Sequence, residues 1–266
     1  MGAGEHGYSV RDLRVTLGAR EVVHGLSFDA APGEMIGLVG PNGSGKTTLL
    51  RALAALVPFS GTVTFRGEHV AAVPRRRLAR AAALMAQHPP TDFAFTAEEV
   101  VGLGRLPHLP LLGTPGASDR ERVREALDRV GATALAHRPL RELSGGERRR
   151  VMMAQALAQD TPVLLLDEPT AHLDVAHQFA LLGAAAQLAA EGRLVIAALH
   201  ELPLAARFCT RILALSDGHL VADAAPADAF TPALFADVFG MEVAVGAGPD
   251  GPDIRYLRPL PPSPAP

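Results

Sequence analysis

The sequence predicts an α/β fold built around a parallel sheet, and two features carry this prediction. Three short runs are apolar throughout and have the length of a strand, at Met35–Val39 and at residues 163–166 and 194–199. Strands that are buried on both faces, as in a parallel sheet, have such continuous apolar runs. Helical patterns follow the first two runs, as expected where helices connect parallel strands.

Composition and charge are those of a folded chain with one large domain or two small ones. Of its 266 residues, 48% are hydrophobic and 20% are charged, which argues against disorder. The net charge of −3 gives no reason to expect a nucleic-acid partner. The single cysteine, Cys209, excludes an internal disulfide and favours a reducing compartment. The N-terminal residues lack an apolar signal-peptide core, and no stretch approaches the roughly 18 apolar residues of a membrane span.

The first third of the chain is predicted to consist of strands and turns. Residues 10–17 and 22–28 form two short runs, and residues 61–65 alternate between apolar and polar positions as a half-buried strand does. The apolar run at Met35–Val39 enters a glycine-rich turn and then a helical pattern over residues 46–56.

The middle third is predicted to be helical and irregular. Residues 74–85 are rich in alanine and arginine, and the arginines at 75–77 are interpreted as a solvated face rather than a binding patch. Ser118 and Glu121 have the spacing of a helix-capping box, in which side chain and backbone cap each other. Gly131 is predicted to end the helix that follows.

The last third returns to alternation of strands and helices. A helix is predicted over residues 176–190, between the two remaining apolar strands, and a hairpin over residues 211–222. Residues 259–266 are rich in proline and are predicted to form a frayed tail.

Residues 40–47 fit the phosphate-loop pattern G-x-x-x-x-G-K-[ST]. Glycines let backbone N–H groups approach phosphate oxygens, and the following helix directs its positive end at the same anion. Lys46, the only lysine among 25 basic residues, is expected to reach the β- and γ-phosphates as a compact point charge, and Thr47 to bind Mg²⁺. The predicted ATP-binding residues of this loop are Gly40, Pro41, Asn42, Gly43, Ser44, Gly45, Lys46, Thr47 and Thr48.

The apolar strand at residues 163–166 ends in two carboxylates, Asp167 and Glu168. At the end of a strand beside a phosphate loop, Asp167 is placed to hold Mg²⁺, and Glu168 is placed to polarise an attacking water. The alternative is that both carboxylates neutralise basic side chains in a loop.

The segment Leu143-Ser144-Gly145-Gly146-Glu147 precedes a helical pattern over residues 148–158. Ser144 and Glu147 have the spacing of a capping box, which is a purely structural interpretation. A helix that begins with Ser-Gly-Gly is also an anion site, because its free N–H groups and its dipole attract phosphate. Both interpretations require the same local geometry.

As an ordered set, these motifs resemble those of the nucleotide-binding subunits of ATP-binding cassette (ABC) transporters, over roughly residues 10–245. In the family's order, the similar segments are Walker A at residues 40–48, the Q-loop at Gln87, the signature at residues 143–147, Walker B at residues 163–168, the D-loop at residues 171–174 and the switch histidine at His200.

The resemblance implies a P-loop ABC ATPase fold with a RecA-like core, an antiparallel β subdomain and a helical subdomain. One ABC ATPase domain is expected over residues 1–245, with the helical subdomain inserted at about residues 88–160. Residues 246–266 are expected to form a hairpin remnant and the proline-rich tail.

The resemblance also implies an ATPase that works as a head-to-tail homodimer with two ATP molecules between the subunits. The signature residues Ser144, Gly145 and Gly146 of one copy bind the ATP that the phosphate loop of the other copy holds. Catalysis of phosphoryl transfer is then mostly positioning and charge neutralisation.

Four further roles follow from the same resemblance. Glu168 acts as general base or positions the water, and His200 contacts the γ-phosphate and steers Glu168. Gln87 contacts Mg²⁺ or the water and reports the nucleotide state to a transmembrane partner. Asp174 links the two sites across the dimer. No metal site is expected at His172 and His177, which are five residues apart.

Local features are similar to importers of iron-siderophores, haem and cobalamin, namely residues 95–108 with their G-R-L-P-H segment, residues 172–178 and residues 205–207. This similarity implies two transmembrane permease subunits, an indirect extracytoplasmic substrate-binding protein and a peripheral location at the cytoplasmic face of the cell membrane. The cargo remains open between these compounds. The alternatives are the ATPase subunit of another ABC transporter, such as an exporter, and a soluble ABC ATPase that is not a transporter.

One position departs from the family pattern. An aromatic residue near the end of the first strands usually stacks on adenine, and the matching position in this chain is Leu17, before Gly18. The adenine-stacking residue is therefore left unassigned.

Overall fold

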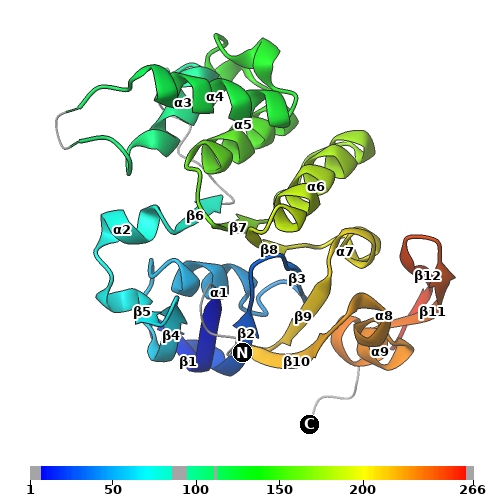
Figure 1. The fold of residues 1–266 in the computed structure, drawn as a ribbon. Helices are drawn as coiled ribbons and strands as arrows, with labels where there is room; N and C mark the ends of the chain where they lie inside the picture. The colour runs from blue at the N-terminus through cyan, green and yellow to red at the C-terminus, as the bar shows by residue number, and fades with distance from the viewer. Residues whose placement is uncertain (1–6, 86–94, 111–112, 262–266) are drawn as a thin grey trace.

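A six-stranded, mostly parallel sheet lies at the centre of the protein. The computed structural model describes residues 7–85, 95–110 and 113–261 (Figure 1). The sheet order is β10-β9-β3-β8-β7-β6, and only β10 runs antiparallel to its neighbour. Its strands are β3 (Met35–Val39), β6 (Ala82–Met85), β7 (Val163–Asp167), β8 (Leu194–Ala198), β9 (Arg211–Ser216) and β10 (His219–Ala224). The parallel core predicted from the apolar runs is confirmed.

The two faces of this sheet belong to two different hydrophobic cores. In β3, Met35 and Val39 pack on one face with helices α5 (Gly145–Ala158) and α6 (Val175–Ala190). Ile36 and Leu38 point to the other face and pack with α1 (Lys46–Leu53). Because side chains alternate along a strand, a wholly apolar run is what a strand between two cores requires.

An antiparallel sheet of order β2-β1-β4-β5 covers α1 from the other side. The Tyr8 hydroxyl donates to the Leu53 carbonyl at 3.0 Å and so fastens this sheet to the end of α1. The strands of this sheet are β1 (Tyr8–Leu17), β2 (Arg20–Ala30), β4 (Ser60–Phe65) and β5 (Glu68–His69).

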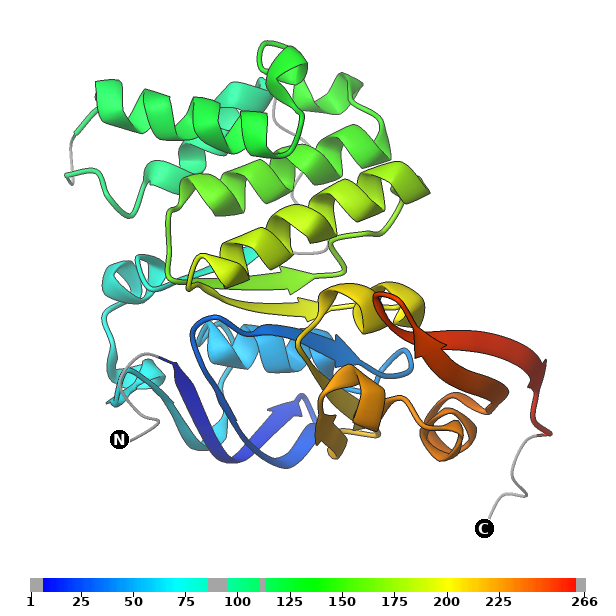
Figure 2. The ribbon, with the colours of Figure 1, turned by 45° about the vertical axis from the view of Figure 1, so that its right-hand side comes forward.

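Helices α3 (Ala97–Gly102), α4 (Ala117–Arg129) and α5 form a separate layer above the sheet (Figure 2). The predicted start of α4 at a Ser118–Glu121 capping box is wrong. The cap lies two residues earlier, at Gly116, whose N–H donates to the Asp119 carboxylate at 3.0 Å. Asp119 is held in place by Arg105, also at 3.0 Å, and this tertiary contact is not readable from local spacing.

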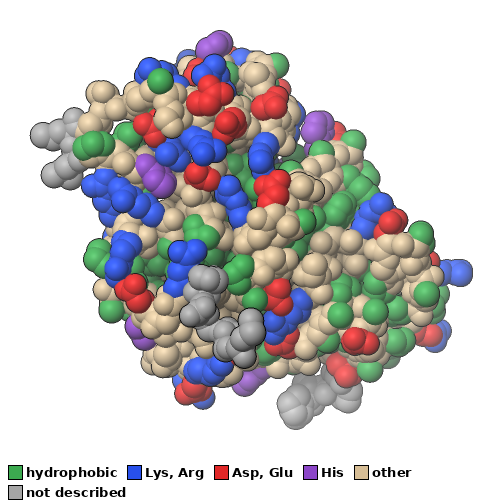
Figure 3. Space-filling model, viewed as in Figure 1, with side chains coloured by type: hydrophobic (Ala, Val, Ile, Leu, Met, Phe, Trp, Pro, Cys, Tyr) green, Lys and Arg blue, Asp and Glu red, His purple; other side chains and the backbone are tan. Residues whose placement is uncertain are grey.

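The assignment of residues 74–85 to the helical part holds only for the first half. Helix α2 spans Arg75–Ala79, and β6 then pairs in parallel with β7 at the edge of the central sheet. Pairing with a buried strand outweighs the helix propensity of alanine. Figure 3 shows basic side chains gathered over α2. Arg76 in α2 and Arg80 just after it both donate to the Pro107 carbonyl.

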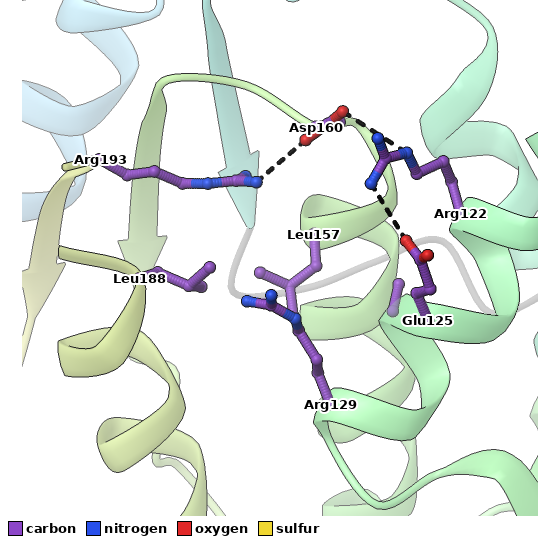
Figure 4. Close-up of a pocket in the computed structure, with 8 residues that line it drawn as sticks. Arg122, Glu125, Arg129, Leu157, Asp160, Leu188 and Arg193 are labelled. Atoms are coloured by element: carbon purple, nitrogen blue, oxygen red, sulfur yellow. Dashed lines mark hydrogen bonds and ion pairs between the residues drawn. The ribbon is translucent and has the colours of Figure 1, made fainter. Parts of the chain in front are cut away.

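Ion pairs join the helical layer to the sheet layer in a small pocket (Figure 4). Asp160, just after α5, accepts from Arg193 at 2.9 Å and lies 3.8 Å from Arg122 of α4. Arg122 also pairs with Glu125 at 3.1 Å. Arg129, which also lines the pocket, pairs with Glu191 at 3.3 Å. Since the charged groups of this pocket are engaged in ion pairs within the chain, we interpret it as a structural contact between the two layers.

The C-terminal part packs beside the central sheet. It contains α7 (Leu202–Phe208), α8 (Pro226–Ala229), α9 (Pro232–Phe239) and a hairpin of β11 (Met241–Gly248) and β12 (Gly251–Pro259). The expected boundary after residue 245 therefore falls inside β11. Among the described residues, we find no helix that combines the length and the apolar character needed to cross a membrane.

Candidate active site

The glycine-rich loop leaves β3 and enters α1, as the phosphate-loop pattern predicts. Gly40, Gly43 and Gly45 have φ values of 148°, 80° and 100°, in the region that favours glycine. A Cβ on Gly40 would lie 2.1 Å from the Leu215 carbonyl oxygen, so no other residue fits there. The loop thus leaves its backbone free to curve around an anion at the positive end of α1.

The side chain of Lys46 is folded into this loop. Its Nζ donates to the carbonyls of Gly40 at 2.7 Å and Pro41 at 2.9 Å, and the residue is only 5% exposed. Burial lowers the pKa of the ammonium, and the negative charges of Glu168 and Asp167 oppose that shift. A buried cation whose charged neighbours are carboxylates is positioned to receive phosphate oxygens.

Asp167 ends β7 beside the start of α1. Its carboxylate accepts a hydrogen bond from the Thr47 hydroxyl at 2.9 Å, and the residue is 2% exposed. Burial raises the pKa of this carboxyl, while the bond from Thr47 opposes the rise. A hydroxyl and a carboxylate in contact are hard oxygen ligands of the kind that Mg²⁺ prefers, so these two residues fit the ion. The buried Ser44 hydroxyl has no hydrogen-bond partner among the described residues, which is consistent with a ligand in the loop.

Glu168 and His200 meet at the carboxyl edge of the sheet. His200 Nε2 lies 2.7 Å from Glu168 Oε1, and the two residues follow the adjacent parallel strands β7 and β8. Glu168 has a φ of 49°, an uncommon conformation for a residue with a side chain and one that occurs at functional sites. A histidine bonded to a carboxylate can fix its orientation toward a water molecule.

The signature segment forms the capping box that its spacing predicts. The Ser144 hydroxyl accepts from the Glu147 N–H at 3.2 Å, and Glu147 accepts from the Ser144 N–H at 2.8 Å. These bonds lower the pKa of the Glu147 carboxyl. Ser144 and Gly145 are exposed, at the start of α5. The structure does not bring them to the phosphate loop of the same chain, since α5 and α1 cover opposite faces of the sheet.

Asp174 caps α6 within its own chain. Its carboxylate accepts from the backbone N–H of His177 at 2.9 Å and lies 2.8 Å from the His177 ring nitrogen. These bonds lower the pKa of Asp174. Asp174 therefore has a capping role within its own chain. The predicted link across a dimer stays a prediction. Gln87, the predicted Q-loop residue, lies outside the described residues.

Strand β2 lies against the phosphate loop. A Cβ on Gly45 would lie 3.1 Å from the Val22 carbonyl oxygen and 3.4 Å from a Val23 methyl group, so β2 runs directly against the loop. Leu17, at the end of β1, is 42% exposed. Sequence reasoning did not identify Val22 and Val23, because their proximity depends on how the two sheets pack.

Sequence reasoning also did not identify the polar pair Thr170 and Glu201. Thr170, which is 2% exposed, donates to the Glu201 carboxylate at 2.8 Å. The bond ties the segment after Glu168 to the residue after His200. Only the adjacency of β7 and β8 makes these residues neighbours, so no local sequence signal points to them.

Comparison with known proteins identifies the family. A family model described as ABC transporter matches residues 23–171. The chain is 42% identical to the cobalamin import ATP-binding protein BtuD of Halobacterium salinarum over 90% of this chain and 60% of the relative's length. It is also 42% identical to the hemin import ATP-binding protein HmuV of Pseudomonas putida, over 91% of this chain and 95% of that protein. The chain belongs to the ABC transporter family.

Solved structures agree with this assignment. A chain from a metal-chelate type ABC transporter in an inward-facing conformation matches with a TM-score of 0.81 and 24% identity, covering 96% of this chain and 98% of that chain. A dimeric bacterial ABC transporter cassette matches with a TM-score of 0.75 and 25% identity, covering 82% and 98%. The expected P-loop ABC ATPase fold is therefore confirmed.

Proposed function

We propose that this protein is the ATP-hydrolysing subunit of an ABC importer for an iron complex, such as haem or a ferric siderophore, or for cobalamin. The observation that carries the ATPase proposal is the contact of His200 with Glu168 at 2.7 Å, at the same sheet edge as Asp167 and Thr47. A phosphate loop, a metal-binding pair and a candidate base thus meet in one place.

ATP is the nucleotide that the family implies, and residues 40–48 hold its phosphates. Lys46 neutralises charge on the β- and γ-phosphates. Thr47 and Asp167 would hold Mg²⁺, with Gln87 as a further predicted ligand, and the ion would supply further charge neutralisation of the phosphates. Glu168 accepts a proton from the attacking water or orients that water, and His200 keeps the Glu168 carboxylate in place.

A second copy of the chain completes the site. The signature residues Ser144, Gly145 and Gly146 lie at the positive end of α5 and away from the phosphate loop of their own chain. In a head-to-tail homodimer they contact the γ-phosphate bound by the other copy, and Asp174 links the two sites. The dimeric form of a structurally similar cassette supports this arrangement.

The transport proposal rests on the relatives and on the segment at residues 95–108. The names of two relatives describe the import of cobalamin and of hemin. We infer two permease subunits as direct partners, an extracytoplasmic substrate-binding protein as an indirect one, and a peripheral position at the cytoplasmic face of the membrane. Deleting the gene and testing growth on haem, ferric siderophore or cobalamin as the limiting source distinguishes the cargoes. Normal growth on all three would contradict the importer proposal.

The ATPase proposal is tested by Glu168→Gln in the purified full chain. We expect turnover to fall by about 10²–10⁴-fold, the range for loss of a general base, because the amide cannot accept the proton. ATP binding, measured by equilibrium dialysis with labelled ATP, should persist, and ATP should now stabilise a dimer in size-exclusion chromatography. Turnover near that of the wild type would remove Glu168 from its assigned role.

A further inference from the structure

Arg149 is a buried cation in the helix that carries the signature. It is 7% exposed, whereas Arg148 and Arg150 on either side are half-buried. A guanidinium is always charged, and burying one is costly unless anionic or hydrogen-bonding groups compensate. The position of Arg149 therefore requires anionic or hydrogen-bonding groups nearby.

The direction of this side chain follows from the packing of α5. A Cβ on Gly145 would lie 3.6 Å from the Cβ of His172, and one on Gly146 would lie 3.2 Å from a methyl group of Leu173. The first turn of α5 thus packs on the loop after β7. Arg149 is three and four residues beyond these glycines, so it lies on the same face of the helix.

The charges on that loop are those of the candidate active site. Burial lowers the pKa of Arg149, and the negative charges of Glu168 and then Asp167 act in the opposite direction. Burial is the main effect on Asp167 and raises its pKa, whereas the hydrogen bond from Thr47 and the positive charges of Arg51 and then Arg149 act in the opposite direction. Lys46 approaches the same two carboxylates from α1, on the other face of the sheet.

We propose that Arg149 is a positioning residue that balances the charge of Asp167 and Glu168 and couples their arrangement to the signature helix of the same chain. The residue contacts no reacting atom in this proposal. In the proposed dimer, the start of α5 binds the nucleotide held by the other copy. A shift of α5 on that binding changes the position of the Arg149 charge relative to the carboxylates of its own chain. The inference rests on the proposed ATPase function.

Two substitutions separate charge from packing. Arg149→Met keeps a long apolar stem and removes the charge, and Arg149→Lys keeps the charge. We expect kcat of the Met variant to fall by about 10–100-fold, the range seen when outer partners of a site are lost, with KM changed by less than about twofold. The Lys variant should recover at least part of kcat, since a cation remains.

Measurements of stability and of ATP binding separate this positioning role from a purely structural role of Arg149. Removing one member of a group of buried charges leaves the others uncompensated, so the thermal midpoint of the Met variant is not taken as unchanged and is measured in parallel. We expect the loss of kcat at temperatures well below that midpoint, where the Met variant is fully folded, which a loss of stability alone would not produce. Binding of labelled ATP without Mg²⁺ should match the wild type. The exposed Arg124, paired with Glu121, provides the control Arg124→Met, which should leave kcat unchanged. Should the Met variant not fold, Arg149→Gln replaces it in the same assays.

The proposal is overturned if the Met or Gln variant retains wild-type kcat, or if the Lys variant is as slow as the variant without charge. Glu168→Gln, measured in parallel, separates this failure from failure of the proposed function. An inactive Glu168→Gln beside a fully active Arg149→Met refutes only the role of Arg149. Full activity of both refutes the assigned role of Glu168 itself.

Discussion

The phosphate-loop region and the signature segment differ in what a single chain supplies to each. Around the phosphate loop, one chain brings together a cation, a candidate metal-binding pair and a carboxylate in contact with a histidine, from the ends of β3, β7 and β8 and the start of α1. At the signature, the chain supplies only a capped helix end, exposed and remote from that loop. The difference teaches that a capping box can fix the conformation of a segment within one chain, whereas the binding role proposed for that segment requires a second copy.

Among the substitutions that test this difference between the two regions, the one expected to have the largest effect on turnover is at Lys46. Lys46→Arg keeps the charge, but a planar guanidinium cannot donate to the Gly40 and Pro41 carbonyls from the same enclosed position. We expect turnover to fall by about a hundredfold, the cost of misplacing a catalytic charge by about 1 Å, together with weaker ATP binding. Steady-state kinetics and equilibrium dialysis measure both.

The control for Lys46 is the exchange Arg124→Lys on the exposed face of α4, which makes the reverse substitution away from the site. It should leave ATP affinity and turnover unchanged. If Lys46→Arg behaved like this control, the single lysine of the chain would be a compositional accident rather than a requirement of the loop.

An intermediate effect is expected at Ser144, which has both a capping and a proposed binding role. Ser144→Ala should cost about 1 kcal/mol of unfolding free energy, as the loss of a helix cap does. Hydrolysis should fall well beyond that loss of stability, because the partner's nucleotide loses a hydrogen-bond donor, while ATP binding to the monomer persists. Chemical denaturation and steady-state assays measure the two quantities.

A matched control exists at Thr231, whose hydroxyl caps α9 by accepting from the Leu234 N–H at 3.1 Å. Thr231→Ala should cost a similar free energy and leave hydrolysis unaffected. Equal activity of the two variants would mean that Ser144 is only a cap.

The smallest effect is expected at Asp174, where a cap and a proposed dimer contact again coincide. The bonds from His177 lower its pKa in the folded state, so the charge stabilises the protein above the unfolded pKa. That contribution is lost as the pH falls through the folded pKa. Asp174→Asn keeps the cap and removes the charge. The difference in thermal midpoint between wild type and variant should thus be present at pH 7 and shrink in acid.

Asp174→Ala is the companion variant, because it removes the cap as well and should be the less stable of the two at neutral pH. A difference between wild type and Asp174→Asn that stays constant with pH would contradict the electrostatic role of Asp174.

The sequence predicted those parts of the fold that depend on residues close together in the chain. Wholly apolar runs identified β3, β7 and β8, and spacing identified the capping box at Ser144. Local reasoning was wrong where a distant partner decides. Residues 82–85 form a strand because β7 offers an open edge, and α4 begins at Ala117 because Arg105 holds Asp119.

By itself, the sequence determined the phosphate loop, the carboxylates at the end of β7 and the helix cap of the signature, because each is set by residues close together in the chain. The tertiary structure alone decided which of these groups meet. Parallel pairing of β7 and β8 brings His200 to Glu168 across 32 positions, and packing of the first turn of α5 on the loop after β7 buries Arg149. The physical reason is that contacts between separate elements depend on how sheets and helices stack, which no local pattern encodes.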